Sequence, residues 1–145
     1  MAEIHPDWKE FLQLLLSKGV RFVLVGGHAL AAHGHPRFTV DLDCFFATDE
    51  DNCRLLRLAL LEFGFGDIGV DSLSSVPQVF MLGRIPFRID LLNSIDGVQF
   101  EEVWKDAEDF ELGGVQLKVI SRRHLIANKL ASGRTKDLAD LEELT

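Results

Sequence analysis

The sequence predicts one α/β domain over residues 1–145, in which helices flank a mixed β-sheet and the C-terminal segment is helical. Segments with the 3.6-residue period of an amphipathic helix alternate along the chain with short apolar or alternating segments typical of strands. The composition, 47% hydrophobic and 26% charged, is that of a globular domain rather than of a disordered or fibrous chain. The expected order of elements is α-β-α-β-α-β-β-α-β-α-α.

The first elements are marked by a change in the hydrophobic period. Apolar residues after Pro6 are spaced along one face of a helix, which predicts a helix over residues 6–18. The segment 20–25 is almost wholly apolar, as expected of a strand that is covered on both faces. The pair Gly26-Gly27 follows at once and leads into a short alanine-rich helix, which we expect to end at Gly34.

The middle of the chain combines an alternating segment, a helix with its own cap and a pair of strands. The expected elements are a strand over residues 39–46, a helix from a Thr48 and Asp51 capping box to Gly64, and a hairpin of strands 76–82 and 85–92 around Gly83-Arg84.

The last third of the chain is predicted to be mostly helical, with one strand inside it. The expected elements are a helix over residues 100–110, a strand over 115–120, a helix from its Ser121 cap to Ala131, and a final helix that carries Leu138, Leu141 and Leu144.

The charge of the chain is acidic overall but uneven. A net charge of −8 disfavours tight, unspecific binding to a nucleic-acid backbone, which requires many cations. The segment 115–136 nevertheless contains six basic residues and no acidic one. This segment suits either a phosphate-bearing ligand or an acidic partner, and the alternative is a solvated helical face.

The sequence also indicates a compartment. Cys44 and Cys53 are interpreted as small apolar residues in a reducing environment. Apolar runs stay well below the roughly 20 residues of a membrane span, and the start of the chain lacks the pattern of a signal peptide. We therefore expect a cytoplasmic protein without a membrane partner.

Three aspartates are the strongest candidates for chemistry. Asp41 and Asp43 share one face of a predicted strand, about 6.6 Å apart along the chain, where each raises the pKa of the other. Asp90 lies in another alternating strand, and if the two strands are neighbours the three carboxylates converge. Such a cluster suits one or two divalent cations of a phosphoryl-type reaction. The alternative is that Asp41 and Asp43 cap the sheet or pair with Arg37 and Arg88, and that Asp90 is only a charge at a strand end.

Other residues suit a bound triphosphate. Gly26 and Gly27 lie where a buried strand meets a helix, so their backbone can approach a ligand closely, although the pair alone is equally consistent with a tight turn. Lys129 shares a helical face with apolar residues, and its ammonium is a candidate partner of the acidic cluster or of phosphates. Arg37, just before the strand with two aspartates, is a similar candidate.

Taken together, these motifs resemble those of a known superfamily. Val25-Gly26-Gly27, Asp41-Leu42-Asp43 and Ile89-Asp90-Leu91 resemble the hG[G/S], DxD and hDh signature of the DNA polymerase β-like nucleotidyltransferases. More narrowly, residues 26–43 and 128–141 look like the AbiEii-like and minimal nucleotidyltransferase toxins. The similarity spans about residues 20–144 and implies a nucleotidyltransferase-type mixed sheet.

The resemblance implies a role for each matching residue. Gly26 and Gly27 would hold a nucleoside triphosphate, and Asp41 and Asp43 would bind the Mg²⁺ or Mn²⁺ that accompanies it. Asp90 would complete a second metal site that activates an acceptor hydroxyl. The same resemblance implies that Lys129 meets phosphate charge and that Asp137 occupies an acidic position of the family's C-terminal segment.

On this basis we expect a protein that binds ATP or another nucleoside triphosphate. It would transfer the nucleoside monophosphate to a hydroxyl of a protein or an RNA end and release pyrophosphate. A toxin opposed by an antitoxin protein is one form of it, and a homodimer could supply the wall that a longer C-terminal domain supplies in relatives. The alternatives are a catalytically silent nucleotide-binding subunit, a small-molecule modifier and, outside the superfamily, a DxD glycosyltransferase.

Overall fold

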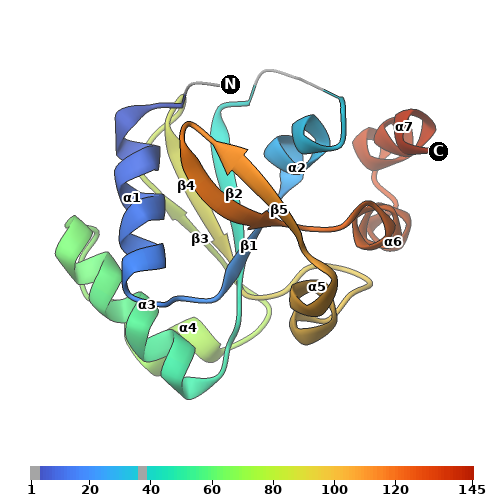
Figure 1. Ribbon diagram of the computed structural model, residues 1–145. Helices are drawn as coiled ribbons and strands as arrows, with labels where there is room; N and C mark the ends of the chain where they lie inside the picture. Colours follow the sequence, from blue (N-terminus) through green and yellow to red (C-terminus); the bar gives the residue numbers. More distant parts are fainter. Residues whose placement is uncertain (1–3, 36–38) are drawn as a thin grey trace.

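The computed structural model describes residues 4–35 and 39–145, which form an α/β arrangement of helices around one sheet (Figure 1). The helices are α1 (Pro6–Ser17), α2 (Gly26–Ala32), α3 (Glu50–Phe63), α4 (Val70–Ser74), α5 (Phe100–Asp106), α6 (Arg122–Ser132) and α7 (Thr135–Leu144). The strands are β1 (Phe22–Val25), β2 (Asp41–Phe46), β3 (Val79–Leu82), β4 (Arg88–Leu92), β5 (Glu108–Leu112) and β6 (Val115–Val119).

The six strands form one mixed sheet in the order β3-β4-β2-β1-β6-β5. The pairs β2/β4 and β1/β6 are parallel, whereas β1/β2, β3/β4 and β5/β6 are antiparallel. This confirms the predicted α/β class with a mixed sheet and a helical C-terminus. The prediction that the strand with Asp90 neighbours the strand with Asp41 and Asp43 is confirmed by the β2/β4 pair.

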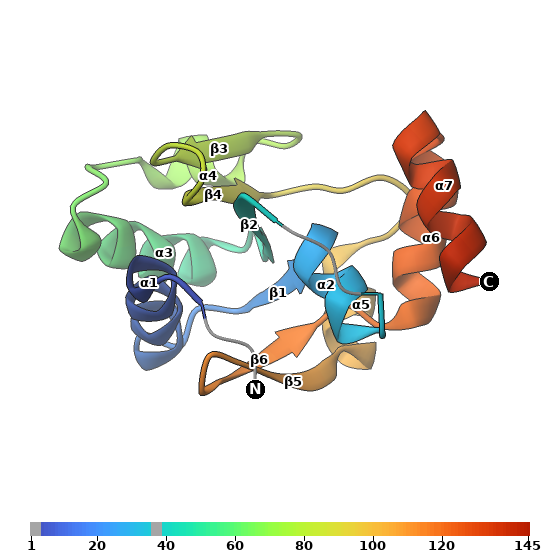
Figure 2. The same ribbon diagram turned by 90° about the horizontal axis from the view of Figure 1, so that it is seen from above.

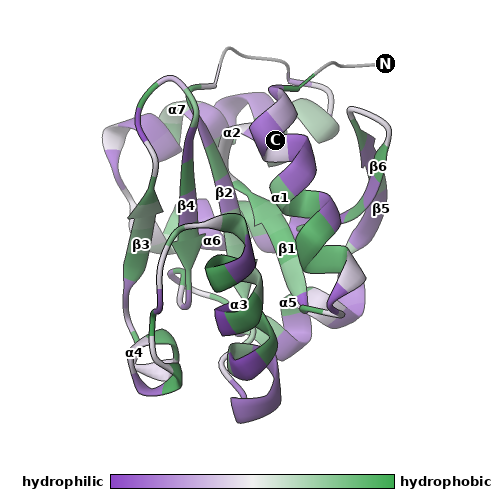
Figure 3. Cartoon of the chain, turned by 90° about the vertical axis from the view of Figure 1, so that its left-hand side faces the viewer, coloured by the Kyte–Doolittle hydropathy of each residue, from purple (hydrophilic) through white to green (hydrophobic). Residues whose placement is uncertain are grey.

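Helices cover both faces of the sheet. Two views at right angles show α1 and α3 together on one side, and α2, α6 and α7 on the other (Figures 1 and 2). All four residues of β1 are buried, as the apolar run predicts, and Phe11 and Leu12 of α1 are fully buried against the sheet. Coloured by hydropathy, β1 is mostly hydrophobic, while α1 and α3 carry both hydrophobic and hydrophilic residues (Figure 3).

Several local predictions differ from the structure. The strands of the predicted hairpin begin at Val79 and Arg88 rather than at residues 76 and 85, so their connection is longer than Gly83-Arg84. The predicted helix 100–110 was too long, because α5 ends at Asp106 and Glu108–Leu112 forms strand β5 at the edge of the sheet. The short helix α4 was not predicted. The cap of α3 is Asp49 rather than Thr48, since Asp49 Oδ2 accepts a hydrogen bond from the Asn52 backbone N–H at 3.1 Å.

Strand β5 was not predicted because its sequence has little hydrophobic pattern. Only Leu112 of this strand is buried, and its acidic side chains face water at an open edge, where charge discourages pairing with another chain. Pairing with β6 through the Gly113-Gly114 turn, and not a local preference, makes this segment a strand.

The two C-terminal helices are joined by buried ion pairs. The predicted Ser121 cap of α6 is confirmed by its hydrogen bond from the His124 N–H. Near the other end of α6, Lys129 Nζ lies 3.2 Å from Asp137 Oδ1 and 2.9 Å from Asp140 Oδ2 of α7. All three side chains of this cluster are at least nine-tenths buried. Because each buried charge has an opposite charge beside it, the cluster fixes α7 against α6.

In the described part of the chain, none of the helices combines the length and the apolar character that crossing a membrane requires.

Replacing Asp137 with asparagine is expected to destabilise the fold near neutral pH. Burial raises the pKa of Asp137, but hydrogen bonds from Arg134, Ser132 and Lys129 outweigh it and lower the pKa from 3.8 to about 2. The carboxylate therefore stabilises the fold above pH 4, and this contribution disappears as the pH falls toward 2. We expect Asp137→Asn to lower the free energy of unfolding by about 2 to 4 kcal/mol at pH 7, measured by urea denaturation.

The matched control is Glu142→Gln, which removes an exposed carboxylate from the same helix. Its effect should stay within about 0.5 kcal/mol. An Asp137→Asn protein as stable as the parent at pH 7 would contradict the stabilising role of the buried cluster.

Candidate active site

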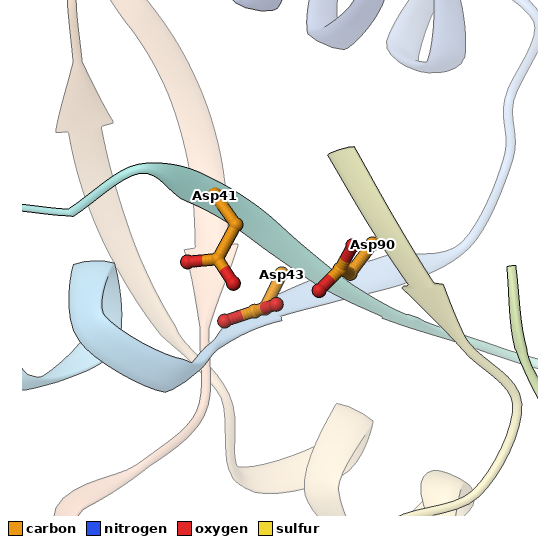
Figure 4. Close-up of side chains that lie close together, drawn as sticks. All are labelled: Asp41, Asp43 and Asp90. Atoms are coloured by element: carbon orange, nitrogen blue, oxygen red, sulfur yellow. The ribbon is translucent and has the colours of Figure 1, made fainter. Parts of the chain in front are cut away.

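The three predicted aspartates converge on one face of the sheet. In the parallel β2/β4 ladder, Asp43 lies opposite Asp90, and alternation places Asp41 on the same face as Asp43. One carboxylate oxygen from each residue lies within 4.8 Å of those of the other two. Figure 4 shows Asp41 and Asp43 on β2 and Asp90 on β4, with the carboxylate of Asp43 between those of the other two. Convergence of the three side chains, predicted on the condition that these strands are neighbours, is thereby confirmed.

The glycine turn after β1 lies directly against this cluster. Val25 is opposite Asp43 in the antiparallel β1/β2 pair, so the next residue, Gly26, approaches the Asp43 side chain. A Cβ atom at Gly26 would lie 2.1 Å from Asp43 Oδ2, and the backbone of Gly26 has a φ of +69°, which disfavours other residues. Glycine is therefore required at this position by both the contact and the backbone conformation.

The cluster is electrostatically unfavourable for its central member. The pKa of Asp43 is raised from 3.8 to about 7, first by burial and then by the negative charges of Asp41 and Asp90, and the positive charge of Arg88 offsets this only in part. A divalent cation among the three carboxylates would favour the ionised form of each. The donors are all carboxylate oxygens, the ligands that Mg²⁺ and Mn²⁺ prefer. The residues present thus fit such a metal.

Arg88 forms ion pairs with two of the three aspartates. Its Nε lies 2.8 Å from Asp90 Oδ1, and its Nη2 lies 3.0 Å from Asp90 Oδ2 and 3.1 Å from Asp41 Oδ2. The alternative that Asp41 and Asp43 pair with Arg88 therefore holds for Asp41, and Arg88 also pairs with Asp90. The other arginine of that alternative, Arg37, lies outside the described residues, and so does its candidate role at the phosphates.

A cavity of about 660 Å³ opens beside the carboxylates. This volume falls within the usual range for small-molecule sites. Its wall includes the three aspartates, the glycine turn and basic residues of the two C-terminal helices. The lining residues relevant to a nucleotide are Gly26, Gly27, Asp41, Asp43, Arg88, Asp90, Lys129, Arg134, Lys136 and Asp137.

Lys129 and Asp137 both line this cavity, but they also face each other. The ammonium of Lys129 is held by Asp137 and Asp140, and the predicted contact between Lys129 and phosphate charge would have to be made from within this cluster. Arg134 and Lys136, which belong to the basic segment 115–136, also line the cavity, and the side chain of Arg134 is 75% exposed. They add positive charge to the wall of the cavity, although the sequence had not singled them out individually.

A family of nucleotidyltransferases matches almost the whole chain. The matching family is described as nucleotidyl transferase of unknown function (DUF2204), and the match covers residues 5–145. The chain belongs to this family. The resemblance to the nucleotidyltransferase superfamily is thus confirmed at this level.

The fold has a relative among solved structures. A candidate nucleotidyltransferase from Thermotoga maritima superposes with a TM-score of 0.63 and 17% sequence identity, over 98% of this chain and 94% of that chain. At this identity the similarity concerns the fold, and it agrees with the predicted nucleotidyltransferase-type sheet. No curated protein matches this sequence significantly.

Removing the charge of Asp43 is expected to stabilise the metal-free protein. Because folding raises the pKa of this acid, its ionised form opposes folding; the penalty is absent below pH 4, grows up to pH 7 and is complete above it. We expect Asp43→Asn to raise the free energy of unfolding at pH 8 by on the order of 2 kcal/mol in the presence of EDTA, with no gain at pH 4. Urea denaturation at the two pH values measures this difference.

The control for that comparison is Asp109→Asn, which neutralises an exposed strand aspartate paired with Lys118. It should change stability by less than about 1 kcal/mol and should not stabilise the protein as pH rises. If Asp43→Asn behaves as this control does, the aspartates do not repel one another in the folded protein.

Gly26→Ala is expected to disturb the site as well as the fold. Gly34→Ala is the matched control, because Gly34 also has a positive φ, +92°, but a Cβ there would meet open space. Each change carries the backbone penalty of about 1 kcal/mol, and Gly26→Ala adds the contact with Asp43. We expect a larger loss of stability for Gly26→Ala and weaker Mn²⁺ binding only for that variant, measured by calorimetry. Equal effects of the two changes would contradict the close packing of the turn on Asp43.

Proposed function

We propose that this protein is a metal-dependent nucleotidyltransferase that transfers a nucleoside monophosphate from a nucleoside triphosphate to an acceptor hydroxyl. The observation that carries the proposal is the convergence of Asp41, Asp43 and Asp90, whose carboxylate oxygens lie within 4.8 Å of one another. The cluster lies beside a glycine turn and a cavity of about 660 Å³. The membership of a nucleotidyl transferase family supports the same reaction class. The raised pKa of Asp43 supports a site that is completed by a cation.

In this proposal Asp41, Asp43 and Asp90 hold Mg²⁺ or Mn²⁺. The bound metal would neutralise the negative charge that develops on the triphosphate. The backbone N–H groups of Gly26 and Gly27 hold the triphosphate, because the absence of side chains lets phosphate oxygens approach.

The reaction itself is a displacement at phosphorus. Asp90 accepts the proton of the acceptor hydroxyl, whose oxygen forms a bond to the α-phosphorus. The bond between the α-phosphorus and its bridging oxygen breaks, and pyrophosphate leaves. Lys129, set within its cluster with Asp137, and the exposed cations Arg134 and Lys136 supply positive charge to the phosphates.

The surroundings of Asp90 favour a protein acceptor over an RNA end. Residues 76–87, which contain β3 and the connection to β4, hold five large exposed hydrophobic side chains and a single charged residue, Arg84. Val79 of β3 lines the cavity, and Met81 of the same strand lies opposite Asp90 in the sheet. A nucleic-acid strand requires cations along its path, whereas an apolar, nearly neutral surface suits a polypeptide.

The resemblance to AbiEii-like and minimal nucleotidyltransferase toxins extends the proposal to a biological role. A toxin of this kind would modify its acceptor in the cytoplasm and would be opposed by an antitoxin protein. A homodimer is the proposed means of completing the acceptor side of the cavity.

A second candidate is a catalytically silent nucleotide-binding subunit of the same fold. The observation that favours it is the set of ion pairs already formed by the candidate residues. Arg88 forms ion pairs with Asp41 and Asp90, and Lys129 forms ion pairs with Asp137 and Asp140. A silent protein would bind a nucleotide without releasing pyrophosphate.

Pyrophosphate release with each of the four nucleoside triphosphates distinguishes the two candidates. We expect release with Mg²⁺ or Mn²⁺, none with EDTA, and a loss of at least about 10³-fold in Asp41→Asn and Asp90→Asn, because each removes charge from the metal site. Asp51→Asn, an exposed carboxylate of α3 on the other side of the sheet, should retain full activity. A radiolabel from the α-phosphate in a protein band would identify the acceptor class.

Nucleotide binding without any pyrophosphate release would favour the silent candidate. Equal activity of the parent, Asp41→Asn and Asp90→Asn would contradict the assignment of the site.

A further inference from the structure

We propose that Arg88 is an internal counter-ion of the carboxylate cluster, which must leave Asp90 before a metal can use that residue, and which then binds the phosphates of the nucleotide. The inference rests on the proposed function, because it concerns the same metal and triphosphate. It assigns to Arg88 a role that links the binding of the two.

The strand geometry places Arg88 among the aspartates. Arg88 precedes Asp90 by two residues in β4, so both side chains lie on the same face of the sheet. It also lies directly opposite Asp41 in the parallel β2/β4 ladder. Its guanidinium is therefore brought to the cluster by the sheet itself and not by a flexible loop.

The contacts of Arg88 use the oxygens that a metal would need. Nε and Nη2 bind the two oxygens of Asp90 side by side, at 2.8 and 3.0 Å, and Nη2 also lies 3.1 Å from Asp41 Oδ2. This two-point arrangement is the strongest geometry of an arginine–carboxylate pair. While it persists, both carboxylate oxygens of Asp90 are engaged.

A guanidinium and a divalent cation on the same carboxylates would also repel each other. The Asp90 side chain is only 10% exposed, so water screens this repulsion weakly. Asp43 lies beside the Arg88–Asp90 pair, and the positive charge of Arg88 stabilises its ionised carboxylate only in part. A metal that is held by all three aspartates therefore requires Arg88 to move.

The cavity offers Arg88 a second partner. Arg88 lines it together with Gly26 and Gly27, the proposed holders of the triphosphate, and its side chain is 26% exposed. A triphosphate provides several anionic oxygens that match the planar fork of a guanidinium. Nucleotide binding would thus attract Arg88 away from Asp90 and complete the metal site only when substrate is present.

The test measures binding of Mn²⁺ alone and of a non-hydrolysable nucleoside triphosphate with saturating Mn²⁺, both at pH 8 by calorimetry. For Arg88→Met we expect opposite changes: about tenfold tighter binding of Mn²⁺ alone and at least about fivefold weaker binding of the nucleotide. A residue with only a structural role would weaken both. At pH 8 protons compete little for Asp43, whose pKa is about 7.

Two further variants make the test decisive. Arg88→Lys keeps the charge but cannot form two parallel hydrogen bonds to the oxygens of Asp90. This variant should therefore bind Mn²⁺ alone more tightly than the parent. It replaces Arg88→Met in the test if Arg88→Met does not fold. Arg57→Met removes a similar two-point pair, with Asp67 on the surface, and should change neither affinity.

The outcomes separate this inference from the proposed function. If the parent binds Mn²⁺ and the folded Arg88 variants bind it equally or more weakly, the role of Arg88 is wrong while the metal site stands. If neither the parent nor any variant binds Mn²⁺ or nucleotide, the proposed function itself fails.

Discussion

Repulsion among three carboxylates that the sheet holds together is the constraint on which the rest of the site depends. The register of β2 and β4 brings one carboxylate oxygen each of Asp41, Asp43 and Asp90 within 4.8 Å of one another. These side chains add no apolar packing, and their charges oppose folding. The raised pKa of Asp43 expresses this cost. Clusters whose charge costs stability in this way are typical of active sites, which supports the proposed role of the three aspartates.

The surrounding elements either tolerate this charge or balance it. Gly26 lets the end of β1 approach Asp43 without a side chain between them, and Arg88 supplies the nearest positive charge. Farther away, the ion pairs of Lys129 with α7 hold a second wall of the cavity in place. The site therefore combines three aspartates held by the sheet with a wall formed by the C-terminal helices. Arg88 is the group whose contacts must change for a metal to bind all three aspartates.

Most of the fold follows from the sequence, and the errors have local causes. Apolar runs and alternation predict the strands that carry the aspartates, because each strand has a buried face. The edge strand Glu108–Leu112 escapes prediction because its charged residues carry almost no hydrophobic signal. Which strands are neighbours is not a local property, so convergence of Asp90 with Asp41 could only be a conditional prediction. The same limit hid the partners of Lys129, which come from the next helix, whereas alternation within β4 already places Arg88 beside Asp90.

The most direct test of the account is a crystal structure of the protein with Mn²⁺ and a non-hydrolysable nucleoside triphosphate, with the metal located by its anomalous scattering. The account predicts an anomalous peak bounded by oxygens of Asp41, Asp43 and Asp90, the triphosphate at the Gly26-Gly27 turn, and Arg88 turned from Asp90 toward a phosphate. A nucleotide bound elsewhere, or no peak at the carboxylates while Arg88 still holds Asp90, would contradict it.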